Sequence, residues 1–134
     1  MTRYFMTLEE AIGLLFKAIE HCYGGEIFVM KMPACKITDL AEVMIEEFNG
    51  QSKLYEFGIR PGEKLHEVLI SEYEAKDTII FDDSYYVILP SLNVNDVKEK
   101  YQQFEKFSAH SYSSNDKLMS KIEIRAKLKA GGFI

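Results

Sequence analysis

The chain has 134 residues and a mass of 15.5 kDa, and 16 basic against 21 acidic residues give it a net charge of −5. Apolar residues make up 47% and charged residues 28%, as in a soluble globular domain, and the acidic balance argues against a nucleic-acid-binding protein. The longest apolar stretch, 11–16, is far shorter than the about 20 residues of a membrane-spanning helix. Two cysteines suit a reducing compartment, so we expect a cytoplasmic protein with a single domain over 1–134, its part 91–134 being a less regular tail of helix and loop.

The first predicted helix follows Thr7. Thr7 and Glu10 have the spacing of a capping box, in which each side chain accepts a hydrogen bond from the other residue's backbone N–H. The apolar residues that follow recur at helical spacing on a wide stripe, so we expect much of this helix to be covered: Leu8, Ala11, Ile12, Leu14, Leu15, Phe16 and Ile19. Gly24 and Gly25 are expected to end the helix.

A strand and a second helix are predicted next. The run 27–30 is apolar throughout, which favours a strand buried on both faces, as in a parallel sheet. Thr38 is the predicted N-cap of the following helix. The Asp39 carboxylate lies in the predicted first turn, where a negative charge interacts favourably with the helix dipole. Asn49 and Gly50 are expected to close this helix, and its buried stripe to comprise Leu40, Val43, Met44 and Phe48.

An extended segment then leads to a turn at Arg60, Pro61 and Gly62. A short helix is expected over 63–70, with Leu65, Val68 and Leu69 facing inward. Two β-rich runs, 78–81 and 85–89, flank a polar turn and predict a hairpin.

The last part of the chain has weaker patterns. A short helix is expected within 97–104, and the polar stretch 110–115 is expected to be a loop. Ser120 and Glu123 form a second capping box that opens a final helix, which a glycine pair ends. The order of elements predicts an α/β fold that lacks the several βαβ units of a complete doubly wound sheet.

Metal binding and covalent catalysis have weak support. No two of the candidate metal ligands have CxxC or HxxxH spacing, so ordinary core or surface roles are favoured for His21, Cys22, Cys35, His66 and His110. There is no G-x-S-x-G motif and no phosphate-cradling glycine loop. His66 and Glu67 could act as acid and base, but adjacent helical residues point in different directions, which favours a surface role.

Two arginines are better candidates. Arg3 lies among aromatic residues before the first helix, and Arg60 precedes a proline and a glycine that fix a tight turn. A guanidinium held by rigid neighbours suits bidentate binding of phosphate or carboxylate, and Glu63 could accept hydrogen bonds from sugar hydroxyls. The alternatives are a structural salt bridge for the arginines and an acid at a helix N-terminus for Glu63.

Three segments, 2–7, 25–33 and 58–67, together resemble a known family. The last reads Gly-Ile-Arg-Pro-Gly-Glu-Lys-Leu-His-Glu, a string long enough to be specific. The segments are similar to the C-terminal part of bacterial UDP-N-acetylglucosamine 4,6-dehydratases. These enzymes belong to the extended short-chain dehydrogenase/reductase superfamily and serve capsule, surface polysaccharide and glycan synthesis. The resemblance extends from residue 2 to about residue 89 and resumes at 111–116.

The resemblance implies a fold and an activity. The fold would be the substrate-binding portion of such an enzyme, without most of the Rossmann sheet. The family's enzymes hold NADP or NAD and make a 4-keto-6-deoxy UDP-sugar, some of them inverting C5, and the cofactor carries the hydride. The glycine-rich fingerprint and the Tyr-x-x-x-Lys pair are missing here, so this chain alone is expected to bind no cofactor and to be inactive.

The resemblance also assigns residues. Arg3 and Arg60 would clamp the diphosphate of a UDP-sugar, Glu63 would bond the uridine ribose, and Lys64, His66 and Glu67 would orient the loop or meet another subunit. Three interpretations stay open. The chain is an enzyme segment completed by a Rossmann domain, a free-standing UDP-sugar-binding module or split-enzyme subunit, or a structural remnant without a ligand.

In the resembling enzymes, the first helix and the strand 27–30 lie near the Rossmann domain. Without that domain, the helix offers more apolar surface than a small fold hides, and the strand has an edge open to pairing. We therefore expect a homodimer or higher oligomer that buries the helix or the strand, with or without exchanged elements. The alternative is a monomer whose last helix folds back over the gap.

Overall fold

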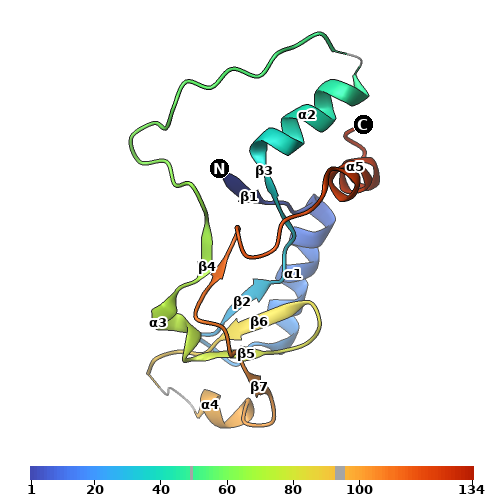
Figure 1. Ribbon diagram of the computed structural model, residues 1–134. Helices are drawn as coiled ribbons and strands as arrows, with labels where there is room; N and C mark the ends of the chain where they lie inside the picture. The colour runs from blue at the N-terminus through green and yellow to red at the C-terminus, as the bar shows by residue number, and fades with distance from the viewer. Residues whose placement is uncertain (49, 93–95) are drawn as a thin grey trace. The chain divides into compact units, whose positions relative to one another are not determined.

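The computed structural model describes residues 1–48, 50–92 and 96–134. The chain passes repeatedly between two compact units (Figure 1). Unit 1 comprises Met1–Phe5, Pro33–Glu67 and Ser114–Ile134, and unit 2 comprises Met6–Met32 and Val68–Ser113. Both units combine helices with small sheets, so the expectation of a mixed α/β fold is confirmed. None of the described helices is long and apolar enough to cross a membrane.

Unit 1 joins a two-stranded sheet to two helices. β1 (Thr2–Tyr4) pairs antiparallel with β3 (Ala34–Lys36), which leads directly into α2 (Ile37–Glu47). α2 packs against α5 (Lys121–Ala130), and the two lie side by side in Figure 1. The core between these elements is formed by four buried side chains, Cys35, Val43, Ile124 and Leu128.

The start of α2 differs from the prediction. Thr38 lies inside the first turn, and the N-cap position is taken by Lys36, whose side chain makes no capping hydrogen bond. Asp39 is in the first turn, as predicted. The helix begins early because β3 ends at Lys36, so strand pairing rather than a capping side chain decides where the helix starts.

The predicted stripe of α2 is only partly buried. Val43 is buried and Leu40 packs against the unit 1 core, whereas Met44 and Phe48 are exposed. The helix ends at Glu47, and Asn49, its predicted end, lies outside the described residues.

The last helix follows its prediction closely. Ser120 and Glu123 form the expected capping box of α5, and Gly131 is its C-cap. Basic residues of α5 pair with acidic residues of α2: Arg125 contacts Glu46, at 2.6 Å, and Glu47, and Lys121 contacts Glu42. These ion pairs accompany the apolar contacts between the two helices.

Unit 2 is built on an antiparallel sheet of four strands. Their order is β2 (Ile27–Met30), β6 (Tyr85–Ile88), β5 (Thr78–Ile80) and β7 (Glu105–Lys106). The predicted hairpin is confirmed as β5 and β6. The prediction of a parallel strand buried on both faces is wrong, because β2 pairs antiparallel with β6 and Val29 is its only buried residue. Within the described sheet β2 is an edge strand, as expected.

The first helix, α1 (Leu8–His21), begins as predicted. The Thr7 N–H donates to Glu10 at 2.7 Å, and the Glu10 N–H donates to the Thr7 hydroxyl at 3.3 Å. The helix ends before the glycine pair, at His21. No residue of α1 is buried, so the prediction that much of this helix is covered is wrong for this chain.

Two predictions fail at a small sheet. β4 (Val68–Ile70) pairs antiparallel with β8 (Tyr112–Ser113), where a helix over 63–70 and a loop over 110–115 were expected. Leu65 and Val68, expected to face inward, are exposed. A helical turn comes later as α3 (Glu72–Ala75), which Ser71 caps. Each strand is stabilised by a partner far along the chain, which local patterns do not reveal.

The rest of unit 2 packs around aromatic side chains. The predicted short helix is confirmed as α4 (Val97–Lys100), which places Val97 and Tyr101 in a buried cluster with Ile79 and Val87. Phe81 lies 5.1 Å from Phe104 between ring centroids, in a stacked arrangement. A second cluster buries Val29, Ile70, Ala75 and Ile88.

Candidate functional site

The turn at Arg60 is fixed by hydrogen bonds of its own residues. The Glu63 N–H donates to the Arg60 carbonyl at 3.1 Å, and the Arg60 N–H donates to the Glu63 carboxylate at 2.9 Å. Pro61 followed by Gly62, with a φ of 86°, suits a type II turn, whose third residue needs positive φ. The helix expected to start at Glu63 does not form, so a role as its N-terminal acid is excluded, and the carboxylate instead holds the turn.

The Arg60 guanidinium is exposed to solvent. Its carbon lies 5.5 Å from the ring centroid of Phe57, which is also exposed. The guanidinium contacts no carboxylate among the described residues. A rigid turn therefore presents a cation that is available to an anionic ligand.

The segment after this turn is anchored to β1. The Thr2 N–H donates to the Leu65 carbonyl at 2.8 Å, and the Thr2 hydroxyl lies 2.8 Å from His66 Nδ1. The Thr2 hydroxyl also lies 2.6 Å from the hydroxyl of Ser114, which accepts the Glu67 N–H at 2.9 Å. Thr2 and Ser114 are both buried. This network, which we call the Thr2–Ser114 network, brings together the segments that begin near residues 2, 58 and 111.

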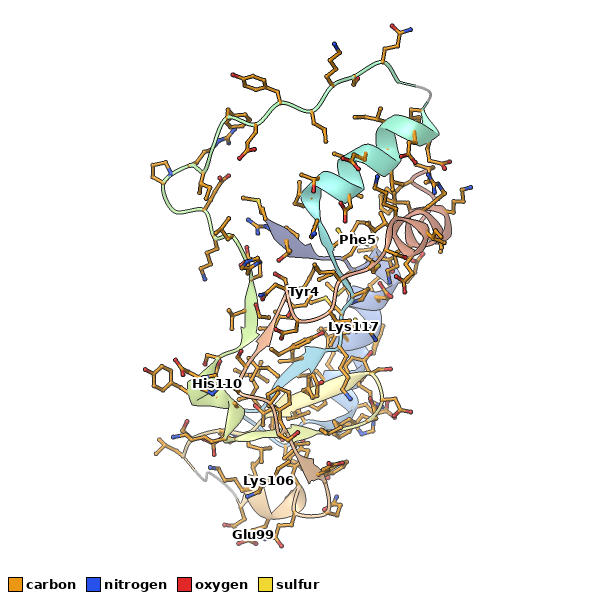
Figure 2. The ribbon with its side chains drawn as sticks, in the orientation of Figure 1. Tyr4, Phe5, Glu99, Lys106, His110 and Lys117 are labelled. Atoms are coloured by element: carbon orange, nitrogen blue, oxygen red, sulfur yellow. The ribbon has the colours of Figure 1, made fainter. Side chains whose placement is uncertain are left out.

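Arg3 contacts the same segment from β1, whose last residue, Tyr4, is labelled in Figure 2. Its guanidinium donates to the carbonyls of Thr2, at 2.7 Å, and Lys64, at 2.9 Å, and its Nε lies 3.4 Å from Glu67. A guanidinium carries five N–H donors, so these contacts leave donors open. The structural salt bridge considered for Arg3 is thus present.

The predicted site residues form two separate sets of contacts in the structure. Arg3 is joined to residues 64–67, whereas Arg60 and Glu63 are joined to each other within the turn. The Lys64 carbonyl and the side chains of His66 and Glu67 contact Thr2 or Arg3 of β1. Sequence reasoning missed Thr2 and Ser114, although both lie in segments that carry the family resemblance.

Neither metal ligands nor a dinucleotide cradle are assembled in the part of the chain that the structure describes. No three His, Cys, Asp or Glu side chains gather there in a way that could hold a metal ion. Both glycine pairs follow a helix, α1 and α5, rather than leading into one. A dinucleotide phosphate is bound where a glycine-rich turn opens a helix, so these residues do not fit such a cofactor.

Comparison with known proteins agrees with the resemblance seen in the sequence. The chain is 34% identical to a UDP-N-acetylglucosamine 4,6-dehydratase (inverting) of Campylobacter jejuni, over 92% of this chain and 38% of that protein. It is 32% identical to a UDP-glucose 4-epimerase of Rickettsia rickettsii, over 83% of this chain and 34% of that protein. The solved structure of Pen from Bacillus thuringiensis matches all of this chain and 39% of its own, with a TM-score of 0.83 and 31% identity.

The chain therefore spans only a little over a third of the length of these relatives. Residues 1–89 match the family model described as polysaccharide biosynthesis protein, and they include the turn at Arg60 and its anchor on β1. The chain belongs to the polysaccharide biosynthesis protein family.

Proposed function

We propose that this chain is the UDP-sugar-binding segment of an NAD(P)-dependent UDP-N-acetylglucosamine 4,6-dehydratase of surface polysaccharide or glycan synthesis. The observation that carries the proposal is the exposed guanidinium of Arg60 on a rigid turn, next to a segment anchored by the Thr2–Ser114 network. A diphosphate presents negatively charged oxygens, which charge-assisted hydrogen bonds from a guanidinium match.

Each site residue has a distinct role in the proposal. Arg60 binds the diphosphate, because its guanidinium meets no carboxylate of the described chain. Arg3 holds the backbone of Lys64 and offers its remaining donors to the same ligand. Glu63 accepts from the Arg60 N–H through one carboxylate oxygen and from a ribose hydroxyl through the other.

Catalysis is proposed to require a second, cofactor-binding part. The chain covers 38% of the dehydratase it resembles, and it contains neither a G-x-x-G-x-x-G fingerprint nor a Tyr-x-x-x-Lys pair. NADP or NAD, when bound to that part, supplies the hydride transfer of the family. This chain supplies binding and orientation of the UDP-sugar.

The binding proposal is tested by titrating the chain with UDP and measuring binding by ligand-observed NMR. Because only part of a complete site is present, the expected Kd is on the order of millimolar, or about −4 kcal/mol. Arg60→Ala removes a charge-assisted contact of about 1.5–3 kcal/mol and should weaken binding by at least about tenfold. Lys53→Ala, which removes an exposed cation from the same extended segment, is the matched control and should bind like the wild type.

Equal UDP affinity of the wild type and Arg60→Ala would contradict the assignment of Arg60. The requirement for a second part is tested separately, by incubating the chain with NADP and UDP-N-acetylglucosamine. No 4-keto product is expected. Turnover by the pure chain would show that catalytic groups exist which the sequence does not reveal.

A further inference from the structure

The Thr2–Ser114 network reaches the surface at His66. The Thr2 hydroxyl lies 2.8 Å from His66 Nδ1 and 2.6 Å from the Ser114 hydroxyl, which accepts the Glu67 N–H at 2.9 Å. Thr2 is 3% exposed and Ser114 is fully buried, whereas His66 is exposed. Each hydroxyl has a single proton to donate, so the direction of every hydrogen bond in the network depends on the others.

One direction of donation gives every proton of the network a close acceptor. The Ser114 oxygen accepts from the Glu67 N–H, and the Ser114 hydroxyl donates to the Thr2 oxygen. The Thr2 hydroxyl is then free to donate to His66 Nδ1 at 2.8 Å. In this arrangement Nδ1 is an acceptor and carries no proton, so the proton of the neutral imidazole is on Nε2.

The opposite direction leaves a buried proton poorly placed. If Nδ1 of His66 donated to Thr2, the Thr2 hydroxyl would donate to Ser114. The Ser114 hydroxyl would then have only the Thr2 carbonyl as an acceptor, at 3.4 Å. That carbonyl already accepts from the Arg3 guanidinium at 2.7 Å. A buried donor with a distant and shared acceptor is unfavourable, so the geometry favours Nδ1 as the acceptor.

The backbone on either side of His66 is attached to the same two residues. The Leu65 carbonyl accepts from the Thr2 N–H at 2.8 Å, and the Glu67 carbonyl accepts from the Ser114 N–H at 2.8 Å. The His66 side chain is a further attachment of this short stretch, which comes just after the turn that carries the candidate ligand-binding residues. A change at Nδ1 therefore acts on the segment that holds this turn.

We propose that His66 is a positioning residue for the Arg60 turn. As the neutral tautomer with its proton on Nε2, it accepts the Thr2 hydroxyl through Nδ1 and so sets the direction of the whole network. The ring does not have to touch the ligand for this role. Its effect on UDP binding rests on the proposed function, whereas its effect on the segment 64–67 does not.

Two variants of His66 with nearly the same shape separate the acceptor from the bulk of the side chain. His66→Asn keeps an acceptor atom bonded to Cγ, as Nδ1 is, and His66→Leu has the same branched shape without an acceptor. Hydrogen exchange of the Glu67 amide should accelerate by about five- to tenfold in His66→Leu, the effect of one hydrogen bond, and by less than about twofold in His66→Asn. His110→Leu, at an exposed histidine, is the control and should leave the exchange unchanged. Equal exchange rates in the two His66 variants would overturn the proposal.

NMR of the imidazole nitrogens tests the tautomer. At about pH 8 an ordinary imidazole is neutral, so the spectrum reports which nitrogen carries the proton. The His66 Nε2 resonance should be that of a protonated nitrogen and the Nδ1 resonance that of an unprotonated one. Thr2→Val replaces the donor hydroxyl with a methyl group and should shift the Nδ1 resonance. A proton on Nδ1, or an Nδ1 resonance that Thr2→Val leaves unmoved, would contradict the assignment.

UDP titration separates this proposal from the proposed function. His66→Leu should weaken UDP binding several-fold and His66→Asn should not, whereas Arg60→Ala should weaken UDP binding without changing exchange of the Glu67 amide. If the wild type binds no UDP, the proposed function fails, while exchange and tautomer still decide whether His66 positions the segment. If UDP binds equally to the wild type and His66→Leu, the positioning role fails even where the assignment of Arg60 holds.

Discussion

Both units have an apolar core, but they differ in the other contacts that accompany it. In unit 1, buried hydroxyls of Thr2 and Ser114 link β1 to the segment that follows the Arg60 turn, and ion pairs accompany the contact of α2 with α5. Unit 2 has a four-stranded antiparallel sheet and two apolar clusters, with stacked and edge-on aromatic rings around Phe81 and Tyr86. Hydrogen bonds are directional, whereas apolar burial is not.

This difference separates the contacts that fix the position of the candidate ligand-binding residues from those that contribute most to the stability of the fold. The candidate ligand-binding residues lie in unit 1, where directional bonds fix the segment that carries them. Burial of large apolar side chains contributes more to stability per residue than a buried hydrogen bond does. Substitutions in the two units should therefore differ in size and in what they disturb.

The largest effect is expected from Ile70→Ala in unit 2. Ile70 is fully buried with Val29, Ala75 and Ile88, so its truncation should lower the free energy of unfolding by about 2–5 kcal/mol. Urea denaturation measures this loss. Ile122→Ala, at an exposed isoleucine, should change it by less than about 0.5 kcal/mol. Similar losses from both variants would mean that the cluster around Ile70 is not a core.

A smaller effect is expected from Ser114→Ala in unit 1. The substitution leaves the Glu67 N–H without its acceptor and removes one partner of the buried Thr2 hydroxyl, which should cost about 1–3 kcal/mol. Hydrogen exchange of the Glu67 amide should accelerate. Ser108→Ala, at an exposed serine, is the control and should leave that exchange unchanged. Unaltered exchange in Ser114→Ala would remove the Thr2–Ser114 network as the anchor of the segment.

The smallest effect on stability is expected from a substitution at Glu26, whose carboxylate makes polar contacts within unit 2. Burial alone would raise the pKa of this carboxyl, but hydrogen bonds from the Tyr23 and Gly24 amides and the Tyr101 hydroxyl outweigh burial and lower the pKa below 4.5. A lowered pKa means that the charged form stabilises the fold. This contribution is complete above pH 4.5 and is lost as the pH falls through the lowered value.

Glu26→Gln removes this charge and should therefore lower the free energy of unfolding at pH 7. The loss should be only about 1 kcal/mol, because solvent screens the partly exposed group. At pH 3 the variant and the wild type should differ less. Urea denaturation at both pH values measures the difference, and Glu56→Gln, at an exposed carboxylate, is the control. A loss that is the same at both pH values would exclude the charge of Glu26 as its cause.

The sequence by itself determined the elements whose signals are local. The capping boxes at Thr7 and Ser120 set the starts of α1 and α5, because both partners of each box lie within four residues. The hairpin of β5 and β6 followed from two β-rich runs around a short polar turn. The family was also readable from sequence, since residues 1–89, which include the string around Arg60, match its model.

Only the tertiary structure decided the rest. Val68–Ile70 became a strand because Tyr112–Ser113 pairs with it, and β2 became an antiparallel edge strand because β6 pairs with it. The Thr2–Ser114 network could not be read from spacing, because its hydroxyls come from opposite ends of the chain. The physical reason is common to these cases. The energy of a strand pair or a buried hydrogen bond belongs to two distant segments, and neither segment carries it alone.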